Sequence, residues 1–350
     1  MNAITFTQAI RETLAAEMRR DPSVFLMGED IGIYGGAFGV TRGLIDEFGP
    51  SRVRNTPISE QALTGIAIGA AVAGQRPVIE IMFMDFITLA VDQLVNMAAK
   101  LRPIYGLDCP LVIRTPPGGG RGYGATHSQS LERLFTGVPG LKIAAPSNAR
   151  DASGLLQTAI RGNSPVLFLE HKMLYPLRFA SEELGVRSEE LGVRSEELGV
   201  TSDFRLQTSN LSLSPPIPFG TANCTRPGND VTIIAWSYMA YLANQAAAQL
   251  EQNGIDAEVI DLRTLAPLDI GMIVDSVKNT GRVLIVEEGP KTGGFAAEIA
   301  AQIMEQAHDY LEKPVRRLAS PDCPIPSAKN LEAACIPSVA DIVRDATGLC

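Results

Sequence analysis

The chain has 350 residues, 45% of them hydrophobic, and carries a formal net charge of −9 at pH 7. This length fits two domains, each large enough to bury its own hydrophobic core. The negative charge argues against a nucleic-acid binder, because such proteins hold phosphates mainly through Lys and Arg. The chain contains no run of 18 apolar residues, so we expect neither a nucleic-acid partner nor a membrane partner.

The five cysteines are scattered along the chain and include no C-x-x-C pair. This pattern argues against a zinc site or a disulfide framework and fits a reducing compartment. The N-terminus reads MNAITFTQ and shows no signal-peptide pattern. We therefore expect a cytoplasmic protein.

In the first half of the chain, short apolar runs alternate with helical patterns. Thr7 is expected to cap a first helix that contains the apolar residues 9–18. Further helices are expected at 61–74, 88–101 and 149–160, and strands at 24–27, 77–81, 111–114, 141–144 and 166–170. A Gly- and Pro-rich loop occupies 115–125. This order predicts an α/β unit whose mostly parallel sheet is covered by helices on both faces.

A second alternation begins after residue 230. Strands are expected at 231–235, 257–262 and 283–287, and helices at 238–253 and 294–307. This pattern indicates a second, separate α/β unit.

Between the two units, SEELGVR occurs at 181–187 and 188–194, and SEELGVT at 195–201. A period of seven would suit a coiled coil, but Leu and Val lie only two apart and each repeat has a Gly, which costs about 1 kcal/mol inside a helix. We interpret 181–216 as a low-complexity, disordered surface insertion or linker, in preference to a partner-binding motif. The domains are then expected at 1–180 and 217–350.

The usual cofactor loops are absent. The chain has no G-x-x-x-x-G-K-[ST], and GGGRGYGATH at 118–127 does not satisfy G-x-G-x-x-G. The sequence therefore gives little support for a P-loop or for a Rossmann dinucleotide site.

Long motifs instead resemble one family. They are RVRNTPISEQALTGIAIGAA at 52–71, EIMFMDFITLAVDQLVNMAAK at 80–100, GYGATHSQSLERLFTGVPGLKIAAPSNARDA at 122–152, EVIDLRTLAPLD at 258–269, VLIVEEGPKTGGFAAEIA at 283–300 and PDCPIPSAKNLEAACIPS at 321–338. Together they resemble β subunits of the thiamine-diphosphate-dependent component of 2-oxo acid dehydrogenase complexes, of the pyruvate or acetoin dehydrogenase type. The resemblance implies an N-terminal transketolase-like pyrimidine-binding domain and a C-terminal transketolase-like domain.

Glu60 is the first candidate catalytic residue. The resemblance implies that its carboxyl hydrogen-bonds the aminopyrimidine of thiamine diphosphate and so helps to activate the thiazolium. Sharing a proton in this way needs a dry site, which Ile58, an expected cofactor contact, and the small-residue helix after Glu60 could supply. The alternative is a first-turn Glu that serves only helix capping.

Met82, Phe86 and His127 are the other candidates. By resemblance, Met82 and Phe86 flank the aminopyrimidine, and the Phe86 ring stacks on it; the alternative is ordinary core packing. His127 is implied to face the arriving lipoyl arm and to donate a proton or stabilise charge during acyl transfer. The alternative is a His that bonds a helix N-terminus.

This sequence departs from the family pattern in two places that concern metal binding. Some relatives hold potassium, which here would use the carbonyls of Leu111, Ala159 and Ile160, but Gly162 stands where many relatives have an acidic residue, which puts the ion in doubt. No GDG motif is present, so magnesium and the diphosphate are expected to be held mainly by an α subunit. The small residues of 62–74 suit a close interface with that subunit; the alternative is packing within the chain.

The resemblance implies decarboxylation of a 2-oxo acid, with pyruvate ranked first, acetoin second and branched-chain acids third. The acetyl group would pass to a lipoyl domain of the dihydrolipoyl acyltransferase component. The enzyme would be a heterotetramer of two α and two β subunits. Alternatives are a catalytically inert scaffold subunit and a stand-alone transketolase-like enzyme.

Overall fold

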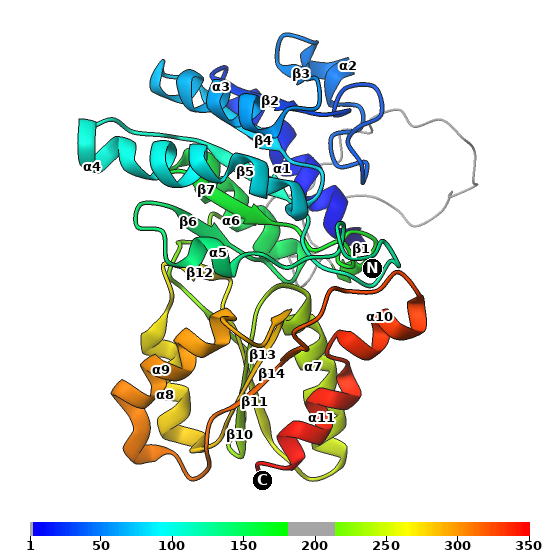
Figure 1. Ribbon diagram of the computed structural model, residues 1–350, viewed down its shortest axis with the longest axis vertical. Helices are drawn as coiled ribbons and strands as arrows, with labels where there is room; N and C mark the ends of the chain where they lie inside the picture. The colour runs from blue at the N-terminus through cyan, green and yellow to red at the C-terminus, as the bar shows by residue number, and fades with distance from the viewer. Residues whose placement is uncertain (1–2, 181–213) are drawn as a thin grey trace, which may run out of the picture.

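The computed structural model describes residues 3–180 and 214–350, which form two α/β units stacked end to end (Figure 1). The SEELGVR repeats and all but 214–216 of the expected linker lie outside the described residues. Within the described ranges, no helix is long and apolar enough to cross a membrane.

The N-terminal unit is built on a seven-stranded sheet of order β12-β6-β7-β5-β4-β2-β3. All neighbouring pairs are parallel except β12 with β6. The strands are β2 (Val24–Gly28), β3 (Val53–Asn55), β4 (Arg76–Glu80), β5 (Val112–Thr115), β6 (Lys142–Ala144), β7 (Val166–Leu169) and β12 (Thr264–Ala266).

Alternate residues of each central strand face different hydrophobic clusters. Phe25 and Met27 of β2 pack with α3 (Glu60–Val72), whereas Val24 and Leu26 pack with α1 (Phe6–Arg20) and α6 (Ala149–Arg161). Because both faces are covered, β2 and β7 are buried along their whole length and consist of apolar residues and glycine, as expected for central parallel strands. The short helices α2 (Leu44–Phe48) and α5 (Arg133–Thr136) complete the unit.

Two expected helix features are wrong. The first helix begins at Phe6, and its N-cap is Thr5 rather than Thr7, because the Thr5 hydroxyl and the Gln8 side chain form a capping box. The expected helix at 88–101 is instead a series of short helices. The Thr88 hydroxyl bonds the Asp85 carbonyl (2.9 Å) and so competes with regular helix bonding. The series comprises η1 (Met84–Ala90), η2 (Gln93–Met97), η3 (Ala98–Lys100) and α4 (Leu101–Tyr105).

The C-terminal unit has a five-stranded sheet of order β14-β13-β10-β11-β9, parallel except for β9. Its strands are β9 (Asn223–Arg226), β10 (Val231–Ala235), β11 (Ala257–Asp261), β13 (Val283–Pro290) and β14 (Arg316–Ser320). Helices α7 (Ser237–Gln252) and α11 (Val339–Thr347) cover one face, and α8 (Ile270–Thr280) and α9 (Phe295–Ala307) the other (Figure 1). The short helices η6 (His308–Tyr310) and α10 (Lys329–Cys335) follow α9 and β14.

The two units are tied together by backbone and side chains. Strand β12 lies in the C-terminal half of the sequence but pairs with β6 of the N-terminal sheet. Arg263 forms an ion pair with Asp151 (2.7 Å), and the Trp236 indole donates to Glu132 (3.2 Å). A small ribbon of β1 (Ala3–Thr5) and β8 (Arg178–Ala180) brings the start and the end of the N-terminal unit together. These contacts fix the position of one unit on the other.

Candidate active site

The predicted site residues follow neighbouring parallel strands at their carboxyl ends. Met82 and Phe86 follow β4, Ile58 and Glu60 follow β3, and the loop to His127 follows β5. Carboxyl ends of parallel strands meet at one edge of the sheet, and ligands of open α/β sheets bind outside that edge. The topology therefore brings the cofactor and catalytic candidates to one edge.

Glu60 is the first residue of α3 and is only 5% exposed. The N-cap, Ser59, makes no side-chain capping bond, and a capping box needs the Glu at the third helical position, not the first. Within residues 3–180 and 214–350, no donor contacts the Glu60 carboxylate. Glu60 is thus a buried first-turn residue that makes no capping-box bond.

Glu29, directly after β2, faces Glu60 and was not foreseen from the sequence. It is buried, and its Oε1 atom has no hydrogen-bond partner among the described atoms. Burial and the nearby charge of Glu60 raise the pKa of Glu29. The ionised form of Glu29 is therefore disfavoured at this site.

Phe86 and His127 meet in an aromatic cluster centred on Phe83. The His127 ring lies edge-on to Phe83 (4.9 Å between centroids) and to Phe86 (5.2 Å). Phe83 also contacts Phe86 (5.9 Å) and Tyr123 (5.9 Å). The sequence indicated Phe86 and His127 separately, whereas Phe83, which joins them, gave no signal beyond its place in the quoted motif.

Ile58 and Met82 are more exposed than Glu60. The Ile58 side chain is 80% exposed, and Met82 is partly buried next to the aromatic cluster. A dry contact between Ile58 and a cofactor requires a second surface over this edge. The cofactor roles of Ile58 and Met82 stay predictions.

The loop that carries His127 is closed on itself. The Gly118 N–H donates to the Gln129 carbonyl (3.1 Å), the His127 N–H donates to the Gly124 carbonyl (3.2 Å), and Thr126 Oγ1 lies 3.0 Å from His127 Nδ1. Lys172, fully buried after β7, donates to the Gly118 carbonyl. Burial lowers the pKa of Lys172 to about 8.

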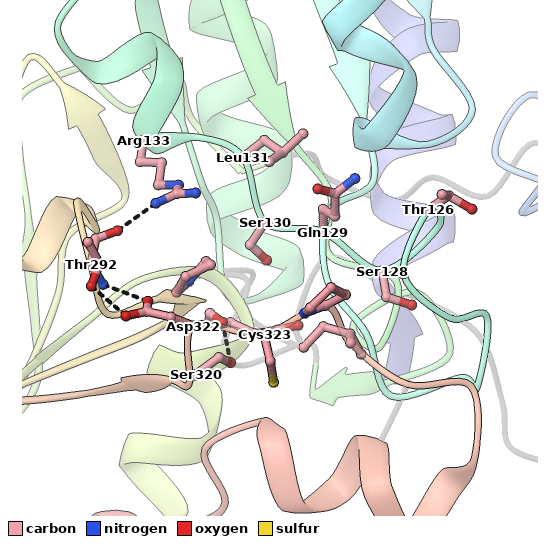
Figure 2. Close-up of a pocket in the computed structure, with 15 residues that line it drawn as sticks. Thr126, Ser128, Gln129, Ser130, Leu131, Arg133, Thr292, Ser320, Asp322 and Cys323 are labelled. Carbon is pink, nitrogen blue, oxygen red and sulfur yellow. Dashed lines mark hydrogen bonds between the residues drawn. The ribbon is translucent and has the colours of Figure 1, made fainter.

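A cavity of about 620 Å³ lies between segment 125–133 and the C-terminal unit (Figure 2). The Arg133 side chain donates to the Thr292 carbonyl (2.6 Å), and the Thr292 N–H donates to Asp322 (3.0 Å). Thr126 and Ser128 line this cavity, but Glu60 and Phe86 do not. The cavity thus lies beside the His127 loop and apart from the predicted cofactor residues.

The residues expected to hold potassium lie at the opposite edge of the sheet. Leu111 immediately precedes β5, and Ala159 and Ile160 are in the last turn of α6. The Leu111 carbonyl accepts from the Val166 N–H (2.8 Å), and the Ile160 carbonyl accepts from Arg76 Nη1 (2.9 Å). These carbonyls, without a carboxylate at Gly162, do not fit a potassium ion as they stand.

No group of three or more His, Cys, Asp or Glu side chains in the described part of the chain could hold a metal ion. Magnesium chelated by a diphosphate needs carboxylate, amide or carbonyl oxygens. The described residues offer no such carboxylate group.

Comparison with known proteins agrees with this arrangement. Residues 2–178 match the model of the transketolase pyrimidine binding domain, and residues 220–342 match that of the transketolase C-terminal domain. A solved structure titled split gene transketolase, inactive beta4 tetramer, superposes with a TM-score of 0.74 at 22% identity, covering 99% of this chain and 98% of its own. At that identity the likeness shows the fold alone.

Curated relatives are closer. The pyruvate dehydrogenase E1 component subunit beta of Rickettsia bellii is 41% identical over 349 residues, covering 99% of this chain and 98% of the relative. The acetoin:2,6-dichlorophenolindophenol oxidoreductase subunit beta of Cupriavidus necator is also 41% identical, covering 97% and 95%. The chain therefore belongs to the transketolase-like family of pyruvate dehydrogenase E1 component β subunits.

Proposed function

We propose that this chain is the β subunit of a thiamine-diphosphate-dependent 2-oxo acid dehydrogenase that decarboxylates pyruvate and passes the acetyl group to a lipoyl domain. The placement of Glu60, a buried residue at the start of α3 and at the carboxyl edge of the sheet, carries the proposal. Acetoin is the second candidate substrate, because the Cupriavidus necator relative matches as well as the Rickettsia bellii one. Branched-chain 2-oxo acids rank third.

Each residue has a role that its surroundings support. Thiamine diphosphate, when bound, would supply the carbon nucleophile and the electron sink. Glu60, a buried residue at this edge, would hydrogen-bond the aminopyrimidine ring and exchange a proton with it. Phe86, with Met82 beside it, would provide an apolar surface for that ring, and His127 would donate a proton to the lipoyl sulfur as the acetyl group is transferred.

The remaining half of the site would come from an α subunit. The described part of the chain offers no metal-binding carboxylate group, so magnesium and the diphosphate are assigned to that partner. The α3 glycines Gly65 and Gly69 support this: a Cβ at Gly69 would meet nothing within 4 Å, and one at Gly65 only the Cγ atom of Gln93 at 3.9 Å. Packing within the chain therefore does not explain them.

Exposed apolar side chains lie on α3 and on segments before and after it. They come from the β3–α3 connection, α3, η1 and α4: Ile58, Ile66, Leu89, Ile104 and Tyr105. Exposed apolar surface of this kind marks an interaction site. We propose that the α subunit covers it within a heterotetramer of two α and two β subunits, and that the dihydrolipoyl acyltransferase component is the further partner.

The test is to co-express the chain with the α subunit of the same organism and to assay pyruvate, acetoin and branched-chain 2-oxo acids with thiamine diphosphate. Glu60→Gln should abolish turnover and leave the heterotetramer intact. Glu251→Gln, which removes only a surface ion pair with Arg226, should behave like the wild type.

Full activity of Glu60→Gln would refute the mechanism. Turnover of acetoin alone would show that the substrate is acetoin and not pyruvate. An assembled wild-type complex that turns over none of the three substrates would favour the inert scaffold.

A further inference from the structure

The glycine-rich loop before His127 is held by two carboxylates of the C-terminal unit. Glu332 of α10 accepts hydrogen bonds from the Gly120 N–H (2.9 Å) and the Gly122 N–H (2.7 Å). Glu288 of β13 accepts from the Gly119 N–H (2.6 Å). Both carboxylates are buried, and hydrogen bonds to a buried anion are about twice as strong as neutral ones. We call this pair the carboxylate clamp.

The N-terminal unit orients the clamp. His171 Nδ1 accepts from the Met173 N–H (3.1 Å), so the proton is assigned to Nε2, which donates to Glu288 (2.5 Å). Burial alone would raise the pKa of Glu288, but His171, the Gly119 N–H and Lys172 outweigh it, and the pKa lies below its usual value. Glu288 is therefore an anion at neutral pH.

The glycines are required by this close approach. A Cβ at Gly118 would lie 1.9 Å from His171 Nε2, and one at Gly119 would lie 2.7 Å from the Ile336 side chain. Gly118 and Gly120 also have φ near +90°, where other residues are strained. The loop is thus shaped to lay its N–H groups on the clamp, which explains a Gly-rich sequence that fits no phosphate-binding motif.

We propose that Glu288 and Glu332 are positioning residues that set the His127 imidazole for acyl transfer. The inference rests on the proposed function and extends it, because it gives the C-terminal unit a part in a reaction whose other predicted residues all come from the N-terminal unit. The clamp fixes Gly119–Gly122, and the closed loop carries that fixed geometry to His127 and its ring contacts with Phe83 and Phe86.

The test compares two half-reactions of the assembled complex. Glu332→Gln should slow acetylation of a free lipoyl domain about 10- to 100-fold, the usual cost of a small misplacement, and leave pyruvate oxidation by an artificial electron acceptor nearly unchanged. Glu332→Asp should recover part of the loss. In a His127→Ala background, Glu332→Gln should not slow acetylation any further, since Glu332 acts through His127.

Three results would contradict the positioning role of the carboxylate clamp. They are an equal loss of rate in both half-reactions, no loss of rate in either, and a further loss of rate in the His127→Ala background. If Glu332→Gln does not assemble, Glu288→Gln gives the same comparison. A wild-type complex that does not oxidise pyruvate with the artificial electron acceptor would instead refute the proposed function. Failure of the positioning role and failure of the proposed function are therefore distinguishable.

A second inference comes from the opposite edge of the sheet. Arg76 Nη1 donates to the carbonyls of Ile160 (2.9 Å) and Gly162 (2.7 Å), and Nη2 donates to Asn163 Oδ1 (3.1 Å). Arg76 Nε lies 3.6 Å from the Asp21 carboxylate. The last carbonyls of a helix lack partners within it and attract positive charge. The guanidinium supplies that charge at the end of α6.

We infer that Arg76 takes the place of the potassium ion that relatives are expected to bind here. The guanidinium is permanently charged and presents several donors in one plane. It satisfies the Ile160 carbonyl, one of the three expected to coordinate potassium, together with the neighbouring Gly162 carbonyl. Gly162, where a carboxylate would be needed, fits this replacement. The complex should therefore be indifferent to potassium.

The test is thermal unfolding of the assembled complex in KCl and in choline chloride at equal ionic strength. The wild type should melt at the same temperature in both. Arg76→Ala should melt lower by several degrees, because part-buried acceptors are left unpaired, and potassium should recover part of the loss. Arg317→Ala, which removes a hydrogen bond to the Lys291 carbonyl, should show no potassium response.

Potassium-specific stabilisation of the wild type would contradict the inference that Arg76 takes the place of potassium. So would an Arg76→Ala variant that melts like the wild type, or one that is destabilised but does not respond to potassium.

Discussion

The His127 imidazole lies edge-on to the Phe86 ring, with centroids 5.2 Å apart and ring planes at 86°. The two residues follow different strands and come together through Phe83, which contacts both. A residue proposed for acyl transfer is thus packed against one proposed to contact the cofactor. Rotation of either ring would disturb the other.

Phe83→Leu should therefore impair acyl transfer more than cofactor binding. The change removes four edge-on ring contacts, each worth about 0.5–1.5 kcal/mol beyond burial, and frees His127 to rotate. Acetylation of a lipoyl domain and the thiamine diphosphate dissociation constant should be measured on the assembled complex. Tyr123→Phe keeps the ring and should match the wild type. Equal effects of the two substitutions would contradict the role of Phe83.

Local pattern was enough to predict the architecture. Apolar runs and helical periods gave two α/β units with mostly parallel sheets, because strands covered on both faces are mostly apolar. The pattern could not show that β12, within the C-terminal half, pairs with β6. That pairing depends on how the two units dock.

The site was predictable only in part. Glu60, Phe86 and His127 stand in long motifs, and the topology brings their segments to one edge of the sheet. Glu332 was missed because it meets Gly120 and Gly122 more than 200 positions away in sequence, and a hydrogen bond of that range leaves no local pattern. Glu29 was missed because its significance lies in its proximity to Glu60 and not in its neighbours along the chain.

Arg114 is expected to be the most sensitive charged residue of the N-terminal core. It lies fully buried between Glu80 (2.8 Å) and Glu170 (2.6 Å), and Tyr175 also donates to Glu170 (2.9 Å). Arg114→Met would leave two buried carboxylates without their cation, which typically costs about 3–5 kcal/mol. Urea unfolding at pH 7 should show this loss.

The combined change Arg114→Met, Glu80→Gln and Glu170→Gln removes all three charges and should restore much of the stability. If the single variant were as stable as the wild type, the charges would not be coupled as the geometry indicates.

Glu287 should make stability depend on pH. Burial, together with the nearby Glu132, raises its pKa to about 7, above the value near 4.5 of an exposed Glu. Between these values the folded state binds a proton that the unfolded state lacks, so this contribution to stability is lost as pH rises from about 4.5 to 7. Glu287→Gln should thus match the wild type at pH 4 and exceed it at pH 8, by on the order of 3 kcal/mol at most.

Thermal or urea unfolding of both proteins across this range would test the prediction. The difference between them isolates Glu287 from the other titrating groups. A variant that is less stable than the wild type at pH 8 would contradict it.

Gly69 should respond in opposite directions in the isolated chain and in the complex. It lies within α3, and a Cβ there would meet nothing within 4 Å. Gly69→Ala should therefore stabilise the chain alone by about 0.5–1 kcal/mol, the helix preference of Ala over Gly. If the α subunit packs closely on α3, the same methyl group should weaken assembly, and Gly69→Leu should weaken it much more.

The measurements are urea unfolding of the purified chain and light scattering of the co-expressed complex. Gly271→Ala in α8, where a Cβ would come no closer than 3.7 Å to any atom, is the matched control and should leave assembly unchanged. Small residues are needed on α3 only if a partner helix packs closely against it. If Gly69→Ala stabilised the chain without weakening assembly, the α subunit would bind elsewhere. Stabilisation of the chain with loss of the complex would show that glycine is kept in α3 for the interface, at a cost to the stability of the subunit itself.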